Sequence, residues 1–366
     1  MNTICRSLSI ASAFAVPVLS LFIAATASGR PEAARAERSR VTIMTWNVEN
    51  LFDTIHDDGK EDFTYLPLAT KRQMPGLEEA CQKMSTDFFR KECRENDWSD
   101  AIVDDKLNRM VDVITQVGNG RGPDIQILVE VENQRVLEQL RDRLPNSGYK
   151  TAVLLEGRDE RGIDNAVLSR FEQWDEPRIH FVPFKTTSPQ DEKSATSTRG
   201  ILEVRLLLPD GQKVAVFALH LPSQSNPSYL RQQAVQHLNA LKAKLPADVI
   251  AIAGGDFNIT RKEDSERKYV SGILAGEWQV SHLIGCQGCS GSHYFPKEDP
   301  QFQWSFLDLL LFDTTNSREW RVDATTIRTP HESHWQNNLQ GKPLHFTPGK
   351  DFGVSDHWPM YAEIYR

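Results

Sequence analysis

Apolar residues recur in short blocks along the chain, and turn-forming residues bound most of these blocks. The segment "RVTIMTWNVENLF" (40–52) alternates apolar and polar side chains and is rich in Val and Thr, which predicts a β-strand. The runs "GPDIQILVEVEN" (122–133) and "DVIAIAGGDFN" (248–258) predict two further strands. Helical spacing of apolar residues predicts three helices, in residues 104–117, 134–144 and 227–245.

Several of the remaining strands form local pairs. Residues 149–157 and 162–170 predict two strands around the polar loop "GRDER", and residues 201–223 predict a hairpin closed by Pro-Asp-Gly. Residues 306–312 and 355–366 add two more strands. Hairpins mixed with helices favour antiparallel-rich mixed sheets that pack on each other, with helices outside. We find no internal repeat or long linker, so residues 40–366 are expected to form one catalytic domain.

Two regions depart from this pattern. Residues 53–104 are mixed in charge and lack a clear period, and we interpret them as an insertion or long loop after the first strand. Residues 1–27 carry one basic residue, a long apolar run and a small-residue end, which is typical of a secretory signal peptide. A retained membrane anchor is the alternative, and Pro17 together with "ATA" favours cleavage. Residues 28–39 would be a flexible lead-in, and the protein would be secreted or periplasmic.

Composition and cysteine content fit an exported globular protein. The chain has 366 residues, 39% hydrophobic residues and a net charge of −8, which neither indicates nor excludes a nucleic-acid ligand. Apart from Cys5 in the leader, the cysteines form an even set, so disulfides are expected. Local pairs, Cys81–Cys93 and Cys286–Cys289, are the simplest of three connectivities. A redox or metal role for "CQGC" is the less favoured alternative.

Polar residues stand at the ends of several apolar strands. They are Asn47, Glu49, Glu130, Glu132, His220, Asp256, Asn258, Asp308, Asp356 and His357. Each alone could be a turn residue, a cap or a satisfied structural histidine. As a set they are hard to explain by turns, because burying a polar group without a partner costs of order 2–7 kcal/mol. A divalent cation would compensate the acids, and oxygen ligands suit Mg²⁺, Mn²⁺ or Ca²⁺.

Six motifs occur in a characteristic order: "TWNVENLF", "LVEVEN", "LHLPS", "GGDFN", "FLDLLLF" and "SDHWP". With them the chain resembles the endonuclease/exonuclease/phosphatase superfamily, and most of all its secreted bacterial nuclease-like branch. The resemblance covers residues 41–366, with 53–104 less well covered. It implies an α/β fold, a four-layered sandwich of two mixed, largely antiparallel sheets with helices on the outer faces.

The resemblance also implies roles for individual residues. Asn47 and Glu130, with Asp356, match metal-binding positions, although Val129 replaces the glutamine that often precedes this glutamate. Asp256 and Asn258 match the pair that orients the attacking water and contacts the phosphate. His220 matches a general-acid position, and Asp308 matches the acid that holds the last histidine, His357. The implied cofactor is Mg²⁺, with Mn²⁺ or Ca²⁺ as alternatives.

Other residues are candidates for weaker reasons. Arg161 and Arg199 are predicted to contact substrate phosphate, and Asp164 or Glu156 could orient His220. Glu49 and Glu132 are weaker candidates for metal ligands than Asn47 and Glu130, which lie two residues before them.

The sequence therefore predicts a secreted, metal-dependent phosphodiesterase, in the first place a nuclease with a nucleic-acid substrate. A sphingomyelinase-like or inositol-phosphate hydrolase is the alternative, since the aromatic segment 293–306 could contact either a membrane or bases. A non-catalytic binding module is a second alternative. We expect a monomer without a protein partner or a stable membrane anchor.

Overall fold

The computed structural model describes residues 39–317 and 319–366, which form one contact-defined unit. The predicted signal peptide (1–27), Cys5 and all of the predicted lead-in except Ser39 lie outside the described residues. Among the described helices, none has both the length and the apolar character needed to cross a bilayer.

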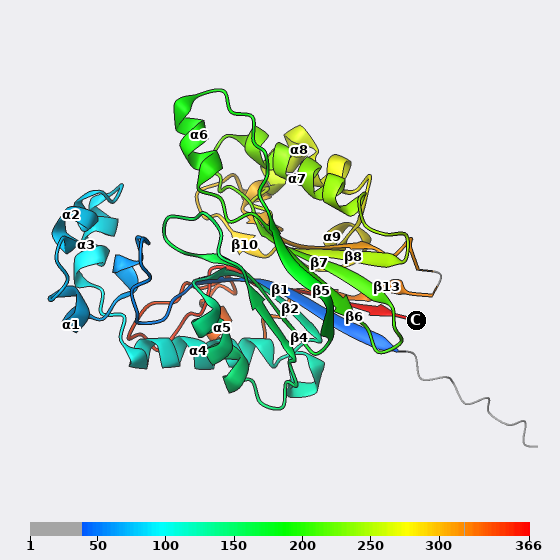
Figure 1. Cartoon of the computed structure of the whole chain (residues 1–366), viewed down its shortest axis with the longest axis horizontal. Coiled ribbons are helices and arrows are strands. Elements are labelled where there is room, and N and C mark those ends of the chain that lie inside the picture. The colour runs from blue at the N-terminus through cyan, green and yellow to red at the C-terminus, as the bar shows by residue number, and fades with distance from the viewer. Residues whose placement is uncertain (1–38, 318) are drawn as a thin grey trace, which may run out of the picture. The chain divides into compact units, whose positions relative to one another are not determined.

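Two six-stranded sheets form the centre of the domain (Figure 1). The first has the order β13-β14-β1-β2-β4-β3, with bounds Arg321–Arg328, Met360–Tyr365, Arg40–Leu51, Ile125–Val131, Asp164–Ser169 and Thr151–Leu154. The second has the order β5-β6-β7-β8-β12-β9, with bounds Glu172–His180, Ile201–Leu207, Lys213–His220, Val249–Asp256, Asp308–Asp313 and Gln279–Val280. In these sheets β1 pairs with β2, and β7 with β8, in parallel, and the other pairs are antiparallel.

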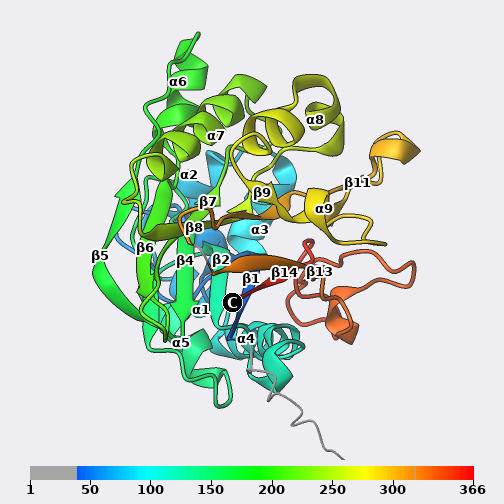
Figure 2. The same cartoon turned by 90° about the vertical axis from the view of Figure 1, so that its right-hand side faces the viewer.

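Helices cover the outer faces of both sheets. Figures 1 and 2 show α4 (Asp100–Ile114) and α5 (Gln134–Arg143) on one side and α7 (Ser228–Lys242) and α8 (Arg261–Arg267) on the other. The other α-helices and strands are α1 (Leu68–Lys71), α2 (Leu77–Gln82), α3 (Asp87–Glu95), α6 (Pro189–Thr196), α9 (Ser281–Ile284), β10 (His293–Tyr294) and β11 (Trp304–Ser305). The predicted four-layered α/β sandwich is thereby confirmed.

The alternating side chains of β1 explain why the layers form. Ile43 belongs to the cluster between the sheets, where it joins residues of β2, β6, β7 and β8. Its neighbour Met44 points to the opposite face and belongs to the cluster that includes α4 and α5. A third cluster joins β7 and β8 to α7. Successive residues of a strand face opposite sides, so a central strand buried on both faces reads as a nearly continuous apolar run.

The segment after β1 is more ordered than its sequence pattern indicates. It contains the short helices α1, α2 and α3, and the Cys81–Cys93 disulfide joins α2 to α3. The second local pair, Cys286–Cys289, is also present. Helix α4 begins at Asp100 rather than at residue 104, and its first turn already places Val103 in the core. The edge strands β5 and β13 were not predicted, and both are charged and only partly buried.

Gly255 allows β7 and β8 to approach closely beside the site described below. Its φ is +142°, and a Cβ at this position would lie 1.8 Å from the Leu219 carbonyl oxygen. We expect Gly255→Ala to lower the free energy of unfolding by about 3 kcal/mol or more, because the side chain would clash with backbone. Gly211→Ala is the matched control. Gly211 also has positive φ but open space around it, so its loss should be only about 1–2 kcal/mol. Equal losses in urea denaturation would contradict the clash.

Candidate active site

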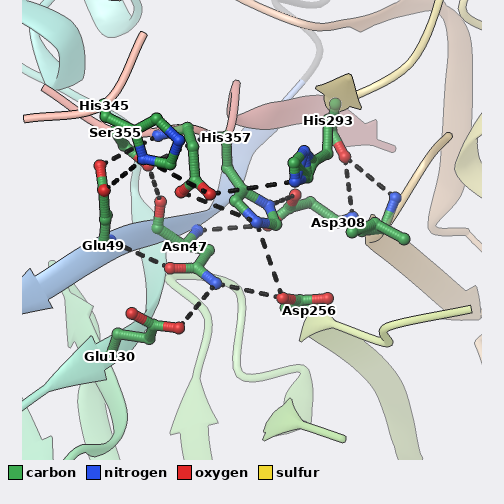
Figure 3. A network of polar contacts seen from close by, with 12 residues as sticks. Asn47, Glu49, Glu130, Asp256, His293, Asp308, His345, Ser355 and His357 are labelled. Atoms are coloured by element: carbon green, nitrogen blue, oxygen red, sulfur yellow. Dashed lines mark hydrogen bonds and ion pairs between the residues drawn. The ribbon is translucent and has the colours of Figure 1, made fainter. Parts of the chain in front are cut away.

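The strand ends of both sheets bring the predicted polar residues together (Figure 3). In the second sheet His220 pairs with Asp256, and Asp256 pairs with Asp308, so three neighbouring strands present these side chains at one level. In the first sheet Asn47 lies opposite Val129, one residue before Glu130. The loop before β14 supplies Ser355, Asp356 and His357.

The backbone at this edge is unusual. Glu49, Asn50, Glu130 and Asn258 have φ between 52° and 66°, and they are half of the non-glycine residues with positive φ in the described part of the chain. The ladders of β1 and β2 shift register at the same place. Bulges of this kind re-aim side chains, and they persist only where surrounding contacts hold them. This distortion explains how Glu49 and Glu130 both turn toward the site.

Asn47 holds two carboxylates beside each other. Its Nδ2 donates to Glu130 Oε1 at 3.3 Å and to Asp256 Oδ2 at 3.1 Å. Its Oδ1 accepts from the Glu49 N–H at 3.0 Å. In this arrangement Asn47 positions the carboxylates, and direct metal ligation through Oδ1 would require the amide to rotate. The Asn50 N–H fixes the other oxygen of Glu130 at 3.0 Å.

His357 and Asp308 form a buried ion pair. The Nδ1 of His357 lies 2.6 Å from Asp308 Oδ2, and the other Asp308 oxygen accepts from the Asn47 N–H at 3.2 Å. Burial lowers the pKa of His357, but Asp308, Asp356 and Asp256 outweigh burial and raise that pKa well above its usual value. These carboxylates therefore favour the cationic form of His357. Its Nε2 lies between two carboxylates, 3.9 Å from Asp256 and 4.0 Å from Asp356.

Asp256 and His220 are shifted toward their neutral forms. Burial raises the pKa of Asp256 to about 7, and nearby Asp308 adds to the rise. Burial, with Arg199 and Arg161, lowers the pKa of His220 well below its usual value. The Nε2 of His220 lies 3.5 Å from Asp256 Oδ2. A neutral imidazole carries one N–H, so His220 is a hydrogen-bond donor rather than a ready source of a proton at neutral pH.

The prediction that Asp164 or Glu156 orients His220 is wrong. Within the described residues, His220 Nδ1 is buried and has no hydrogen-bond partner. Asp164 instead accepts from the Gly157 N–H at 2.8 Å, and Glu156 pairs with Lys60. Asp164 is the first residue of β4, which pairs with β2.

Asn258 contacts the site through its backbone. Its N–H donates to Asp256 Oδ1 at 2.8 Å, and its side-chain amide donates to the Leu221 carbonyl, one residue beyond His220. Residues 256–258 thus form a turn held by a side-chain-to-backbone hydrogen bond, and both Asp256 and Asn258 are buried. Asn258 therefore fixes the geometry of Asp256 and of the chain that follows His220.

A second group of acids and histidines lies on the other side of His357. Glu49 pairs with His345 at 2.6 Å and accepts from the Asp356 N–H at 3.2 Å. Asp356 also lies 3.9 Å from His293 and from His345. Sequence reasoning missed both of these histidines, because each stands alone beside aromatic residues rather than at the end of an apolar strand. Glu132 lies away from this group and accepts from the Asp53 N–H.

The oxygen donors at the site fit a hard divalent cation. Glu49 and Asp356, with His345, offer ligand atoms that all lie within 4.8 Å of one another, while Glu130 is held by the side chain of Asn47 (Figure 3). Carboxylates gathered in a partly buried place repel one another unless a cation balances them. Oxygen ligands are those that Mg²⁺ prefers. The donor set therefore fits the expected metal, with Glu130 and Asp356 as candidate ligands.

Arg161 and Arg199 line a cavity of about 310 Å³ together with Glu130 and His220. Arg199 pairs with Asp159 at 2.8 Å, and its Nε is buried without a partner among the described residues. Arg161 is half exposed and lies 3.5 Å from the same carboxylate. The two predicted substrate arginines therefore meet beside the candidate catalytic groups.

The chain resembles known proteins in sequence family and in fold. A model of the endonuclease/exonuclease/phosphatase family matches residues 78–268. The chain belongs to this family. Members of the superfamily are generally metal-dependent hydrolases of phosphodiesters or phosphate esters. No curated protein matches the sequence of this chain.

Solved structures share the fold at low sequence identity. A humanized D. rerio TDP2 is 16% identical, with a TM-score of 0.53 over 89% of this chain and 98% of that one. D. rerio TDP2 complexed with a single-strand DNA product is 17% identical, with a TM-score of 0.52 over 89% and 99%. A family protein from Bacteroides thetaiotaomicron is 15% identical, with a TM-score of 0.53 over 90% and 96%.

Asp164 generates a prediction about stability and pH. Burial raises the pKa of Asp164 to about 7, although the Gly157 N–H lowers it. Because the usual aspartate pKa is about 3.9, the folded protein keeps a proton that the unfolded chain loses as pH rises from about 4 to 7. This group therefore makes the protein less stable as pH rises through that window.

We expect Asp164→Asn to remove this dependence. The stability of the variant relative to the wild type, measured by urea denaturation, should increase from pH 4 to pH 7 by of order 2 kcal/mol. The exposed Asp351→Asn is the control and should show no such trend. A parallel pair of pH profiles for wild type and Asp164→Asn would rule out a buried, protonated Asp164.

Proposed function

We propose that this protein is a divalent-metal-dependent phosphodiesterase that hydrolyses nucleic acid. The observation that carries the proposal is the buried Asp308–His357 pair, whose cationic imidazole faces the Asp256 carboxyl. A phosphodiester is an anion that resists attack by another anion. A fixed cation beside a carboxyl group with a pKa of about 7 provides both charge stabilisation and a proton acceptor in the working range.

The side chains divide the chemistry between them. Asp256 accepts a proton from the attacking water, and the Asn258 N–H keeps its carboxyl oriented. His357, held by Asp308, stabilises the charge that develops on the phosphoryl oxygens. His220 offers its N–H to the leaving oxygen. Asn47 keeps Glu130 and Asp256 at a fixed separation.

A divalent cation, when bound, would neutralise a phosphoryl oxygen and assist departure of the leaving group. Glu130 and Asp356 would hold it, with Glu49 as a further oxygen donor. The Asn50 N–H fixes Glu130 and the Asp356 N–H fixes Glu49, so part of the ligand geometry exists before the metal binds.

Three features support a nucleic-acid substrate. Arg161 and Arg199 offer cationic groups for a phosphate next to the reacting one. The cavity that they line opens directly beside His220 and Glu130. A fold neighbour, D. rerio TDP2, was solved with a single-strand DNA product. We further propose that the protein is exported, which the N-terminal pattern and the two disulfides support.

A substrate panel tests the reaction class. The protein would be incubated with plasmid DNA, RNA, bis-p-nitrophenyl phosphate and a sphingomyelin emulsion, each with Mg²⁺ or with EDTA. We expect cleavage of nucleic acid and of the small diester that EDTA abolishes. Cleavage of sphingomyelin alone would replace the nuclease by a lipid phosphodiesterase. No turnover on any substrate would favour a binding module.

Substitution of the central groups tests the assigned roles. Asp256→Asn and His357→Ala should each lower kcat by at least ~10²-fold, because each removes an acid–base or charge-stabilising group. The exposed Asp351→Asn and His334→Ala are matched controls and should retain wild-type kcat. Near-normal turnover of either site variant on bis-p-nitrophenyl phosphate would remove that residue from the mechanism.

A further inference from the structure

Three cavities that share lining residues form a path beside the candidate active site. The first, of about 590 Å³, is lined by Glu49 and Asn50 of the site and by Tyr65, Phe88 and Phe89 of the insertion. The second, of about 380 Å³, shares Tyr65 and Phe89 with the first and ends at Arg161. The third is the arginine cavity beside His220, which shares Arg161 with the second. The segment that resembled an insertion therefore forms one wall of the path that leaves the candidate active site.

Aromatic side chains build this wall in two layers. Tyr65 stacks on Phe52 with ring centroids 3.9 Å apart, and Trp98 contacts the edge of Tyr65 at 5.1 Å. Phe88 and Phe89 stand in front of this buried layer and are 64% and 48% exposed. Phenylalanine is usually buried, so two neighbouring exposed rings that line a cavity need a reason. The Cys81–Cys93 disulfide fixes the helix that carries them.

One polar atom of a residue that lines the first cavity lacks a partner. Among the described residues, Asn50 Oδ1 is buried without a hydrogen-bond partner, while the Asn50 N–H holds Glu130. Glu92 lines the first and second cavities, and burial raises the pKa of its carboxyl group. An unsatisfied buried acceptor is costly, so it points to a ligand that donates a hydrogen bond. Exocyclic amino groups of nucleobases are such donors.

We propose that the cavity between Phe88, Phe89 and Asn50 binds an unpaired nucleobase next to the scissile phosphate. The inference rests on the proposed nuclease function and adds a substrate class, single-stranded nucleic acid. A base in a duplex keeps its faces stacked on its neighbours, so an aromatic wall can take up only an unpaired base. The path to Arg161 gives the next phosphate a cationic partner.

The alternative occupant, a lipid or a membrane surface, fits the cavity less well. An acyl chain would cover the polar side chains of Glu49 and Glu92 and would give the buried Asn50 oxygen no donor. A nucleobase supplies both an aromatic face for the rings and an amino donor for the Asn50 oxygen. The cavity volume also lies in the range typical of small-molecule sites.

The test compares the double variant Phe88→Ala/Phe89→Ala with the control Phe352→Ala. Phe352 is 45% exposed and does not line these three cavities. Binding of a fluorescein-labelled single-stranded DNA 12-mer and of its duplex would be followed by anisotropy in EDTA, which separates binding from cleavage. Turnover of bis-p-nitrophenyl phosphate with Mg²⁺ would be measured in parallel, together with the thermal unfolding midpoint.

We expect the double variant to bind the single strand roughly 5- to 150-fold more weakly than the wild type, the range for loss of one stacked base. Its duplex binding, diester turnover and unfolding midpoint should match those of the Phe352→Ala control. Phe89→Tyr keeps a ring face and should bind the single strand as the wild type does, which a merely structural role of Phe89 would not require.

Several results would overturn the inference. They are unchanged single-strand binding in the double variant, an equal loss for the duplex, or no strand binding by the wild type. Loss of binding to sphingomyelin-containing vesicles without loss of strand binding would assign the cavity to lipid. These outcomes differ from failure of the proposed function itself, in which the wild type hydrolyses no nucleic acid with Mg²⁺ whatever stands at residues 88 and 89.

Discussion

The buried carboxylate of Asp308 links the two sheets at the site. Asp308 begins β12 in the second sheet, accepts from the Asn47 backbone in the first, and pairs with His357 from the loop before β14. A fully buried charge without partners would cost several kcal/mol, so these contacts must form together if the sheets are to pack. The chemistry and the packing of this edge therefore depend on the same ion pair, and neither can change alone.

Around that pair, side-chain pKa values and backbone φ angles depart from their usual values. Neighbouring carboxylates raise the pKa of His357 although it is buried, burial raises the pKa of Asp256 to about 7, and Glu49 and Glu130 adopt positive φ. Departures of this kind cluster at functional sites because a well-packed scaffold can sustain them. The clusters on either side of the strand ends supply that scaffold.

The sequence predicted the central strands well, because Ile43 and Met44 face different apolar layers and leave an unmistakable pattern. It failed at the edge strands β5 and β13, where one neighbour is missing and charged residues are tolerated. The strand-end acids could be found because each stands at the end of such an apolar run. His345 could not, because a loop brings it to Glu49 from almost 300 residues away in sequence, and no local period reports such a contact.

The Cys81–Cys93 bond lies outside all three apolar clusters. Reduction of this disulfide would therefore remove the covalent link between α2 and α3, while the packing of the sandwich would remain. A reducing environment would then lower the affinity for the ligand, and it would affect the stability of the fold far less. The protein would therefore have its full affinity for the ligand only in an oxidising environment.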